Sequence, residues 1–148
     1  IHTCWKVAVA VPQFCLHTAG ARDALPKELP LADAVFNMSR LGFLLEGLKS
    51  GDADLVSLGG QDRWHQEKRA RLVPGLLKVM EAATAAGAAT AFLSGAGPTV
   101  GAFVDQRRGE EHGLAVAQAM GRAFTEAGVE SQVEVMSVDT RGLEVCPL

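Results

Sequence analysis

The sequence predicts an α+β fold, in which a four-stranded antiparallel sheet carries its helices on one face. Three observations predict it. Four short, mostly apolar runs are typical of strands, several longer stretches show the three- and four-residue apolar spacing of helices, and glycines and prolines separate them. The chain has 148 residues, of which 48% are hydrophobic and 21% charged, and this composition is typical of a globular domain.

The first strand is expected from Trp5 to Pro12, an apolar and β-branched run that stops at a proline. Residues 13–26 are expected to be irregular. A helix should begin after Pro30 and end at Gly51, and it is the clearest amphipathic helix of the chain. Its apolar residues with helical spacing are Leu31, Ala34, Val35, Met38, Leu41, Leu45 and Leu48.

Asp52 is a suitable N-cap for a short helix that runs to Leu58 and ends at the next two glycines. Residues 61–71 are rich in charged and ring side chains. Pro74 should start another helix, which ends at Gly87. The expected inner face of that helix consists of Leu76, Leu77, Met80 and Ala83.

Two strands are expected at 90–94 and 99–105, then a helix at 109–127 and a last strand at 131–138. If the first helical block forms one layer, this order is the split βαβ, ferredoxin-like arrangement. Residues 1–148 show no linker or repeat, so we expect a single domain. The apolar set of the helix at 109–127 is Leu114, Ala117, Met120, Phe124 and Ala127.

Composition argues against several classes of function. The net charge is −3 and no basic stripe is present, so nucleic acid is not an expected partner. No apolar run approaches the ~20 residues of a membrane helix, and no secretory signal follows Ile1. The three cysteines are widely spaced, which favours a reducing, cytoplasmic location. Cys15 and His17 alone are a weak metal signal, and structural roles are favoured for them.

The glycine loop, defined as Ser94, Gly95, Ala96 and Gly97, joins the second and third expected strands of the sequence. Two glycines one residue apart permit positive φ angles and the close approach of a ligand. Successive N–H groups in such a turn can bind an anion. A tight strand connection needs glycine for geometry alone, and both interpretations stay open at this point.

Two arginines lie in stretches without regular periodicity. Arg22 is in the irregular segment after the first strand, and Arg69 precedes Pro74. Arginine presents a planar fork that matches a carboxylate or phosphate bidentately, although most loop charges simply face water. The nearby segment 61–65 contains acidic, ring and imidazole groups, for which packing is favoured over acid–base chemistry.

Taken together, several segments resemble the homoserine kinases of the GHMP kinase superfamily, and the resemblance covers nearly the whole chain. The glycine loop with its flanks looks like the third conserved motif of that superfamily. The two arginine segments are similar to those of the homoserine branch. The segments that carry the resemblance are Val9–Pro12, Thr18–Arg22, Leu25-Pro26, Pro30–Arg40, Asp62–Arg69, Leu72–Gly75, Leu93–Thr99 and Val138–Thr140.

The resemblance implies roles for individual residues. Arg22 and Arg69 would grip the α-carboxylate of homoserine, and Thr18 lies in the same substrate-facing segment. The glycine loop would border the phosphate site. The reaction of the family transfers the γ-phosphoryl group of ATP to the homoserine hydroxyl with Mg²⁺ as counter-ion, a step in threonine biosynthesis that depends on positioning and charge stabilisation.

The chain departs from the family in one large respect. Nothing in it matches the P-x-x-x-G-L-G-S-S-A phosphate loop of the N-terminal half, which carries most ATP and Mg²⁺ contacts. We therefore expect the C-terminal domain only, inactive alone, with no catalytic residue or metal ligand of its own. Its expected partners are its own N-terminal domain, L-homoserine, ATP and, in a homodimer, a second copy.

Two alternatives remain open from the sequence. The chain would also fit a stand-alone ferredoxin-like module that binds a metabolite or a partner protein through its open sheet face. It would equally fit the C-terminal half of another GHMP kinase for a small molecule, such as a mevalonate derivative. The paired arginines favour an amino acid over a sugar.

Overall fold

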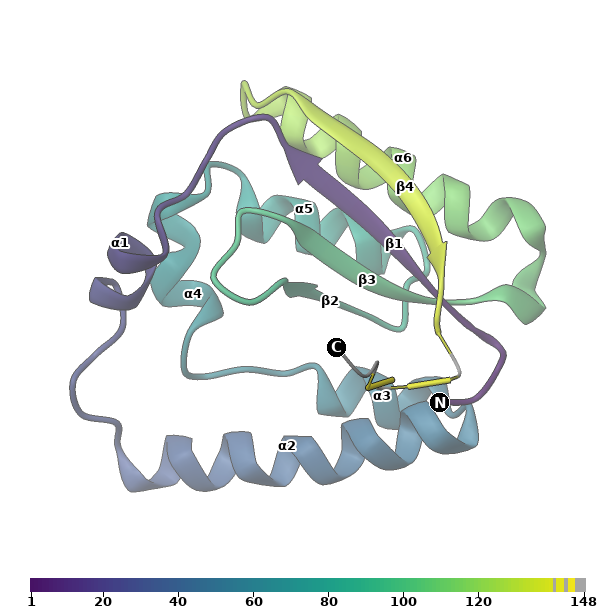
Figure 1. Ribbon diagram of the computed structural model, residues 1–148, viewed down its shortest axis with the longest axis horizontal. Helices are drawn as coiled ribbons and strands as arrows, with labels where there is room; N and C mark the ends of the chain where they lie inside the picture. Colours follow the sequence, from purple (N-terminus) through teal and green to yellow (C-terminus); the bar gives the residue numbers. More distant parts are fainter. Residues whose placement is uncertain (140, 143, 146–148) are drawn as a thin grey trace.

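The computed structural model describes residues 1–139, 141–142 and 144–145, and it arranges four strands in one antiparallel sheet (Figure 1). The strand order is β2-β3-β1-β4, so the first and third strands lie in the centre. The elements are β1 (Trp5–Pro12), α1 (Thr18–Asp23), α2 (Leu31–Ser50), α3 (Ala53–Gly59), α4 (Gln66–Arg69), η1 (Ala70–Leu72), α5 (Leu76–Ala85), β2 (Thr90–Leu93), β3 (Val100–Asp105), η2 (Gln106–Arg108), α6 (Glu110–Glu126) and β4 (Ser131–Ser137).

The α+β class and the four-stranded antiparallel sheet are confirmed, and most predicted boundaries agree to within two residues. Four short elements were missed, namely α4, η1, η2 and the helix α1, which lies in the segment predicted to be irregular. The six residues of α1 include two alanines and a glycine, too few to produce a visible apolar period. Thr140, which ends one of the segments of the resemblance, and Cys146, one of the three cysteines, lie outside the described residues.

The larger core lies between one face of the sheet and the helices α5 and α6. Successive side chains of a strand point to opposite faces, so the even-numbered residues of β1 and β3 share this face. Ala8 and Ala10 of β1 and Val104 of β3 are completely or almost completely buried there. The helical residues that cover them are Leu76, Val79, Ala83, Val116, Ala117, Met120 and Phe124.

The predicted inner faces of α5 and α6 are wrong at two residues. Leu77 of α5 and Leu114 of α6 are each 50% exposed, and Val79 and Val116 are buried. In both helices the buried stripe is centred a few residues from these leucines, because the line of contact follows the sheet rather than the most apolar residues. Small residues at the contact, such as Gly113 beside Val135 of β4, let α6 approach the sheet closely.

The α2–α3 hairpin packs against the opposite face of the sheet, which corrects the expectation that all helices cover one face. Trp5 and Phe103 are odd-numbered residues, and they pack with Val56 of α3 in a second, smaller cluster. The first helical block therefore forms its own layer (Figure 1). The cluster lies near the start of β1, and the even-numbered side chains of β4 on this face are exposed.

Most of the apolar stripe of α2 is not buried by the described residues. Five of its side chains are between 56% and 80% exposed, although they recur with the spacing of a buried helical face. Only Gly47 of this helix is fully buried. The stripe consists of Leu31, Val35, Met38, Leu41 and Leu45.

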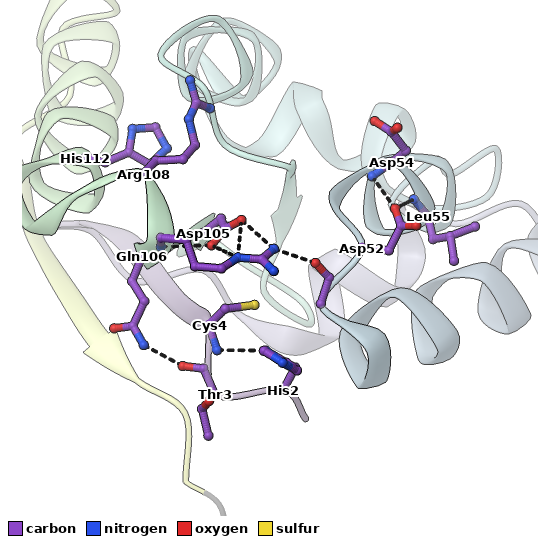
Figure 2. A network of polar contacts seen from close by, with 12 residues as sticks. His2, Thr3, Cys4, Asp52, Asp54, Leu55, Asp105, Gln106, Arg108 and His112 are labelled. Atoms are coloured by element: carbon purple, nitrogen blue, oxygen red, sulfur yellow. Dashed lines mark hydrogen bonds and ion pairs between the residues drawn. The ribbon is translucent and has the colours of Figure 1, made fainter.

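A polar clamp holds the turn between α2 and α3 against the end of β3 (Figure 2). Arg107 forms a bidentate pair with Asp105, in which Nε lies 2.8 Å from Oδ1 and Nη2 lies 2.7 Å from Oδ2. The same Nη2 donates to the Gly51 carbonyl oxygen at 2.6 Å. Gln106 donates to the carbonyl oxygen of Thr3, so the clamp includes the N-terminal segment. No helix of the described chain has the length and apolarity to cross a membrane.

Gly59→Ala is expected to lower the free energy of unfolding by about 1–3 kcal/mol. An added Cβ would lie 2.5 Å from the Cα atom of Leu44, and the backbone of α2 cannot move aside easily. The matched control is Gly42→Ala, since a Cβ there meets nothing within 4 Å and should stabilise α2 by about 0.5–1 kcal/mol. Urea unfolding measures both, and equal effects of the two substitutions would contradict the packing of α3 on α2.

Asp105→Asn is expected to destabilise the chain at neutral pH and to have little effect in acid. The hydrogen bonds from Arg107 lower the pKa of Asp105 below its ordinary value. The stabilisation is therefore present above about pH 4 and disappears as the pH falls through the lowered pKa. Thermal unfolding at several pH values measures this, with Asp139→Asn as control because the Asp139–Arg141 pair is more exposed. A Tm difference that stays constant with pH would rule out the paired carboxylate.

Candidate functional site

Three segments that are distant in the sequence meet at the buried guanidinium of Arg69. Its Nε donates to the carbonyl oxygen of Ala21 in α1 at 3.1 Å, and its Nη1 donates to that of Gly95 at 2.9 Å. Arg69 is only 9% exposed. Figure 1 shows α1, α4 and the β2–β3 connection at the same end of the sheet. The segment of Arg22, the segment of Arg69 and the glycine loop thus form one site.

Two predicted substrate residues lie on α1, next to this junction. Thr18 begins the helix and Arg22 follows one turn later, so both lie on the same side of it. Both side chains are exposed. The structure brings their helix to Arg69 through the carbonyl oxygen of Ala21, while direct contacts between these side chains and a substrate stay a prediction.

The glycine loop turns sharply between β2 and β3. The N–H of Gly97 donates to the Ser94 carbonyl oxygen at 2.9 Å, and Gly95 and Gly97 have φ angles of 56° and 89°. A side chain at Gly97 would lie 2.9 Å from Leu93 Cδ1, so both conformation and space favour glycine there. Within the described part of the chain, the N–H groups of Gly95 and Ala96 have no hydrogen-bond partner. They are available to an anion.

Asp62 holds the start of α4, and sequence analysis did not select it. Its Oδ2 accepts hydrogen bonds from the backbone N–H groups of His65 and Gln66, each at 2.8 Å. Its Oδ1 accepts from Nδ2 of Asn37 in α2 at 2.7 Å. Asp62 lies four residues before the first residue of α4, farther away than an N-cap residue, so the usual capping pattern does not identify it.

Gln66 was also missed, although it holds one end of the glycine loop. Its side chain is 6% exposed, and Oε1 accepts a hydrogen bond from the N–H of Leu93 at 2.8 Å. Gln66 and Arg69 are three residues apart on α4, so they lie on the same side of the helix. No sequence pattern indicates this contact, because it depends on how α4 meets the end of β2.

The surroundings lower the pKa of both Asp62 and His65, which favours a charged carboxylate and a neutral imidazole. Burial raises the pKa of Asp62, but the hydrogen bonds from Gln66, Asn37 and His65 outweigh this effect, and the net pKa is lowered. Burial lowers the pKa of His65, Asp62 opposes the change and Arg69 adds to it. A neutral imidazole can accept the N–H of Arg69 at Nδ1, where the two nitrogens are 3.3 Å apart.

An open groove of about 890 Å³ lies between α2 and the second face of the sheet, beside α4. Its lining is mostly apolar, and polar groups are concentrated at the side that α4 and the preceding segment form. Ligand sites are commonly apolar clefts with a few polar groups. The apolar side chains include Met38, Leu41, Leu44, Phe92 and Phe103, and the polar ones include Asn37, Asp62, His65 and Gln66.

Comparison with known proteins agrees with this geometry. Residues 44–125 match the family described as GHMP kinases C terminal. The chain is 45% identical over 137 residues to a homoserine kinase of Synechococcus sp. (strain CC9902), and 44% identical over 134 residues to one of Trichormus variabilis. These alignments cover 93% and 90% of this chain, but only 42% and 43% of the relatives.

A solved structure shows the same arrangement. The crystal structure of homoserine kinase from Cytophaga hutchinsonii superposes with a TM-score of 0.86 at 30% identity, over 93% of this chain and 43% of that one. The chain thus spans less than half the length of the kinases that it matches. The family match covers more than half of the chain, and the chain belongs to the GHMP kinase family through the C-terminal domain of that family.

Proposed function

We propose that residues 1–148 are the C-terminal, substrate-contacting domain of an ATP-dependent homoserine kinase. The complete enzyme would transfer the γ-phosphoryl group of ATP to the hydroxyl of L-homoserine. The observation that carries this proposal is the junction at Arg69, which joins an arginine-bearing helix to an anion-compatible loop. The names of the relatives support the choice of homoserine as the substrate.

Arg22 and Arg69 would bind the α-carboxylate of the amino acid. Arg69 uses Nε and Nη1 for backbone carbonyl oxygens, which leaves Nη2 for a ligand. Arg22 is exposed on the adjoining helix. A planar guanidinium is suited to a carboxylate, and two of them would make the site selective for an acidic substrate group. The Thr18 hydroxyl, one turn from Arg22, would add a hydrogen bond.

The glycine loop would border the phosphate that is transferred. The free N–H groups of Gly95 and Ala96 and the exposed Ser94 hydroxyl are suited to phosphate oxygens. Such donors stabilise negative charge as it develops on the transferring group. The rigid support of the loop by α4 means that little reorganisation would accompany the reaction.

ATP and Mg²⁺ would be bound mainly by the rest of the kinase. Magnesium prefers carboxylates and phosphate oxygens, and the described residues contain no cluster of three acidic, histidine or cysteine side chains. The exposed apolar stripe of α2 is a suitable contact surface for the N-terminal domain or for a second copy. Residues 1–148 would accordingly be one domain of a two-domain enzyme.

Arg22→Ala is expected to raise the KM for L-homoserine by about tenfold to a hundredfold, since it removes a hydrogen-bonded charge partner. The assay uses a complete kinase in which residues 1–148 form the C-terminal part. The matched control is Arg71→Ala, because Arg71 has the same charge and is exposed on the neighbouring η1. The KM for ATP should change little in either variant.

The isolated 148-residue chain should fold but phosphorylate no homoserine, and the N-terminal half should restore turnover. An unchanged KM for homoserine in Arg22→Ala would remove this arginine from the substrate site. Preference of the complete enzyme for a sugar or a mevalonate derivative would overturn the choice of homoserine.

A further inference from the structure

We propose that Asn37 and Asp62 form a positioning pair, which sets the place of the glycine loop through α4. The two residues do not belong to the loop, and neither is assigned a contact with substrate. The inference rests on the proposed function in one respect, namely that the glycine loop takes part in catalysis. The physical coupling itself is a property of this chain.

The first connection is the hydrogen bond between Asn37 of α2 and Asp62, which precedes α4. The Asp62 carboxylate is almost fully buried, with 9% of its side chain exposed, and both of its oxygens accept hydrogen bonds. Asn37 donates to one of them, while its own Oδ1 accepts from the N–H of Arg63 at 3.0 Å. The amide of Asn37 therefore has a defined orientation, because its two ends have partners of opposite kind.

The second connection consists of the hydrogen bonds from α4 to the glycine loop and the residue before it. A helix of four residues is not stable by itself, so its position depends on its packing and on the hydrogen bonds from its first N–H groups to Asp62. Gln66 binds the N–H of Leu93, just before the loop, and Arg69 binds the carbonyl oxygen of Gly95, inside it. These two contacts lie on either side of Ser94. A shift of α4 would move both together.

The pair has a reciprocal hydrogen-bond pattern that an exchange of the two residues preserves. Asn37→Asp alone would place two carboxylates face to face. Asp62→Asn alone would turn an amide NH₂ group either toward the NH₂ group of Asn37 or toward the N–H groups of α4. In the exchanged double variant, the new asparagine at 62 again accepts from α4 and donates to the new aspartate at 37. That aspartate can still accept from Arg63.

The test measures amide hydrogen exchange by NMR in the 148-residue chain. The N–H of Leu93 is the reporter because it donates to Gln66. Asn37→Asp and Asp62→Asn should each speed its exchange by about tenfold or more, since the supporting contact opens more often. The double exchange should return the rate to within about twofold of the parent chain. Asn37→Ala is a milder variant, which replaces Asn37→Asp in the test if that variant fails to fold. It should speed the exchange of the Leu93 N–H by about threefold.

The matched control is Asp52→Asn. Asp52 is the N-cap of α3 and likewise accepts two backbone hydrogen bonds through one carboxylate oxygen, from the N–H groups of Asp54 at 2.9 Å and Leu55 at 3.1 Å. Among the described residues, it has no hydrogen bond to α4 or the glycine loop. In the Asp52→Asn variant, the exchange rate of the Leu93 N–H should stay within about twofold of the rate in the parent chain, because the loss of an N-cap on α3 is a local change.

Three results would overturn the proposal. They are unchanged Leu93 exchange in Asp62→Asn and Asn37→Ala, equal acceleration in Asp52→Asn, and failure of the folded double variant to restore the rate. In the complete kinase, kcat/KM should fall at least about tenfold in Asp62→Asn and recover in the double variant. If the exchange pattern holds but the kinase phosphorylates another alcohol, the positioning pair stands and the proposed function fails.

Discussion

The buried guanidinium of Arg69 is the interaction on which the site depends. It joins the carbonyl oxygens of Ala21 and Gly95, which belong to segments 74 residues apart in the sequence. Arginine fits this place because its planar fork can donate in two directions while it remains charged. A cation that is 9% exposed is costly unless hydrogen bonds replace its water, and two carbonyl oxygens and the neutral imidazole of His65 do so.

The sheet gives this junction a rigid base. On one face, α5 and α6 bury a continuous apolar core, and β2 and β3 extend from it to the glycine loop. On the other face, α2 and α3 cover the start of β1 and leave a groove beside α4. The Asn37–Asp62 contact crosses this groove's edge. The long helix with the exposed apolar stripe is thereby connected to the site.

The sequence predicted the strands, the sheet and the long helices because their signals are local. Alternating or apolar runs and the cap at Asp52 specify an element without reference to its neighbours. The side of the sheet that α2 and α3 occupy was not predictable, because their stripe is only partly buried within the chain. The prediction that Leu77 and Leu114 face the sheet was wrong for a related reason. Both residues are apolar, but apolar character alone does not determine which residue of a helix faces the sheet.

The candidate site was predictable in part. The glycine loop was visible as two glycines one residue apart, Arg69 was visible as an arginine in a stretch without regular periodicity, and the resemblance gave both of them roles. Their support was not visible. Gln66, Asp62 and Asn37 act through hydrogen bonds between segments that only the tertiary structure brings together. Arg69 itself has a structural function that its predicted role as a substrate ligand did not suggest.

The most direct test is the chemical-shift response of the chain to Arg69→Lys. Lysine keeps the charge, but its single ammonium group cannot span the carbonyl oxygens of Ala21 and Gly95. We expect the amide resonances of residues 21–22 and 95–97 to shift together, while those of β1 and β4 stay in place. A variant that shifts only one of the two segments, or neither, would contradict the role of Arg69 as the junction of the site.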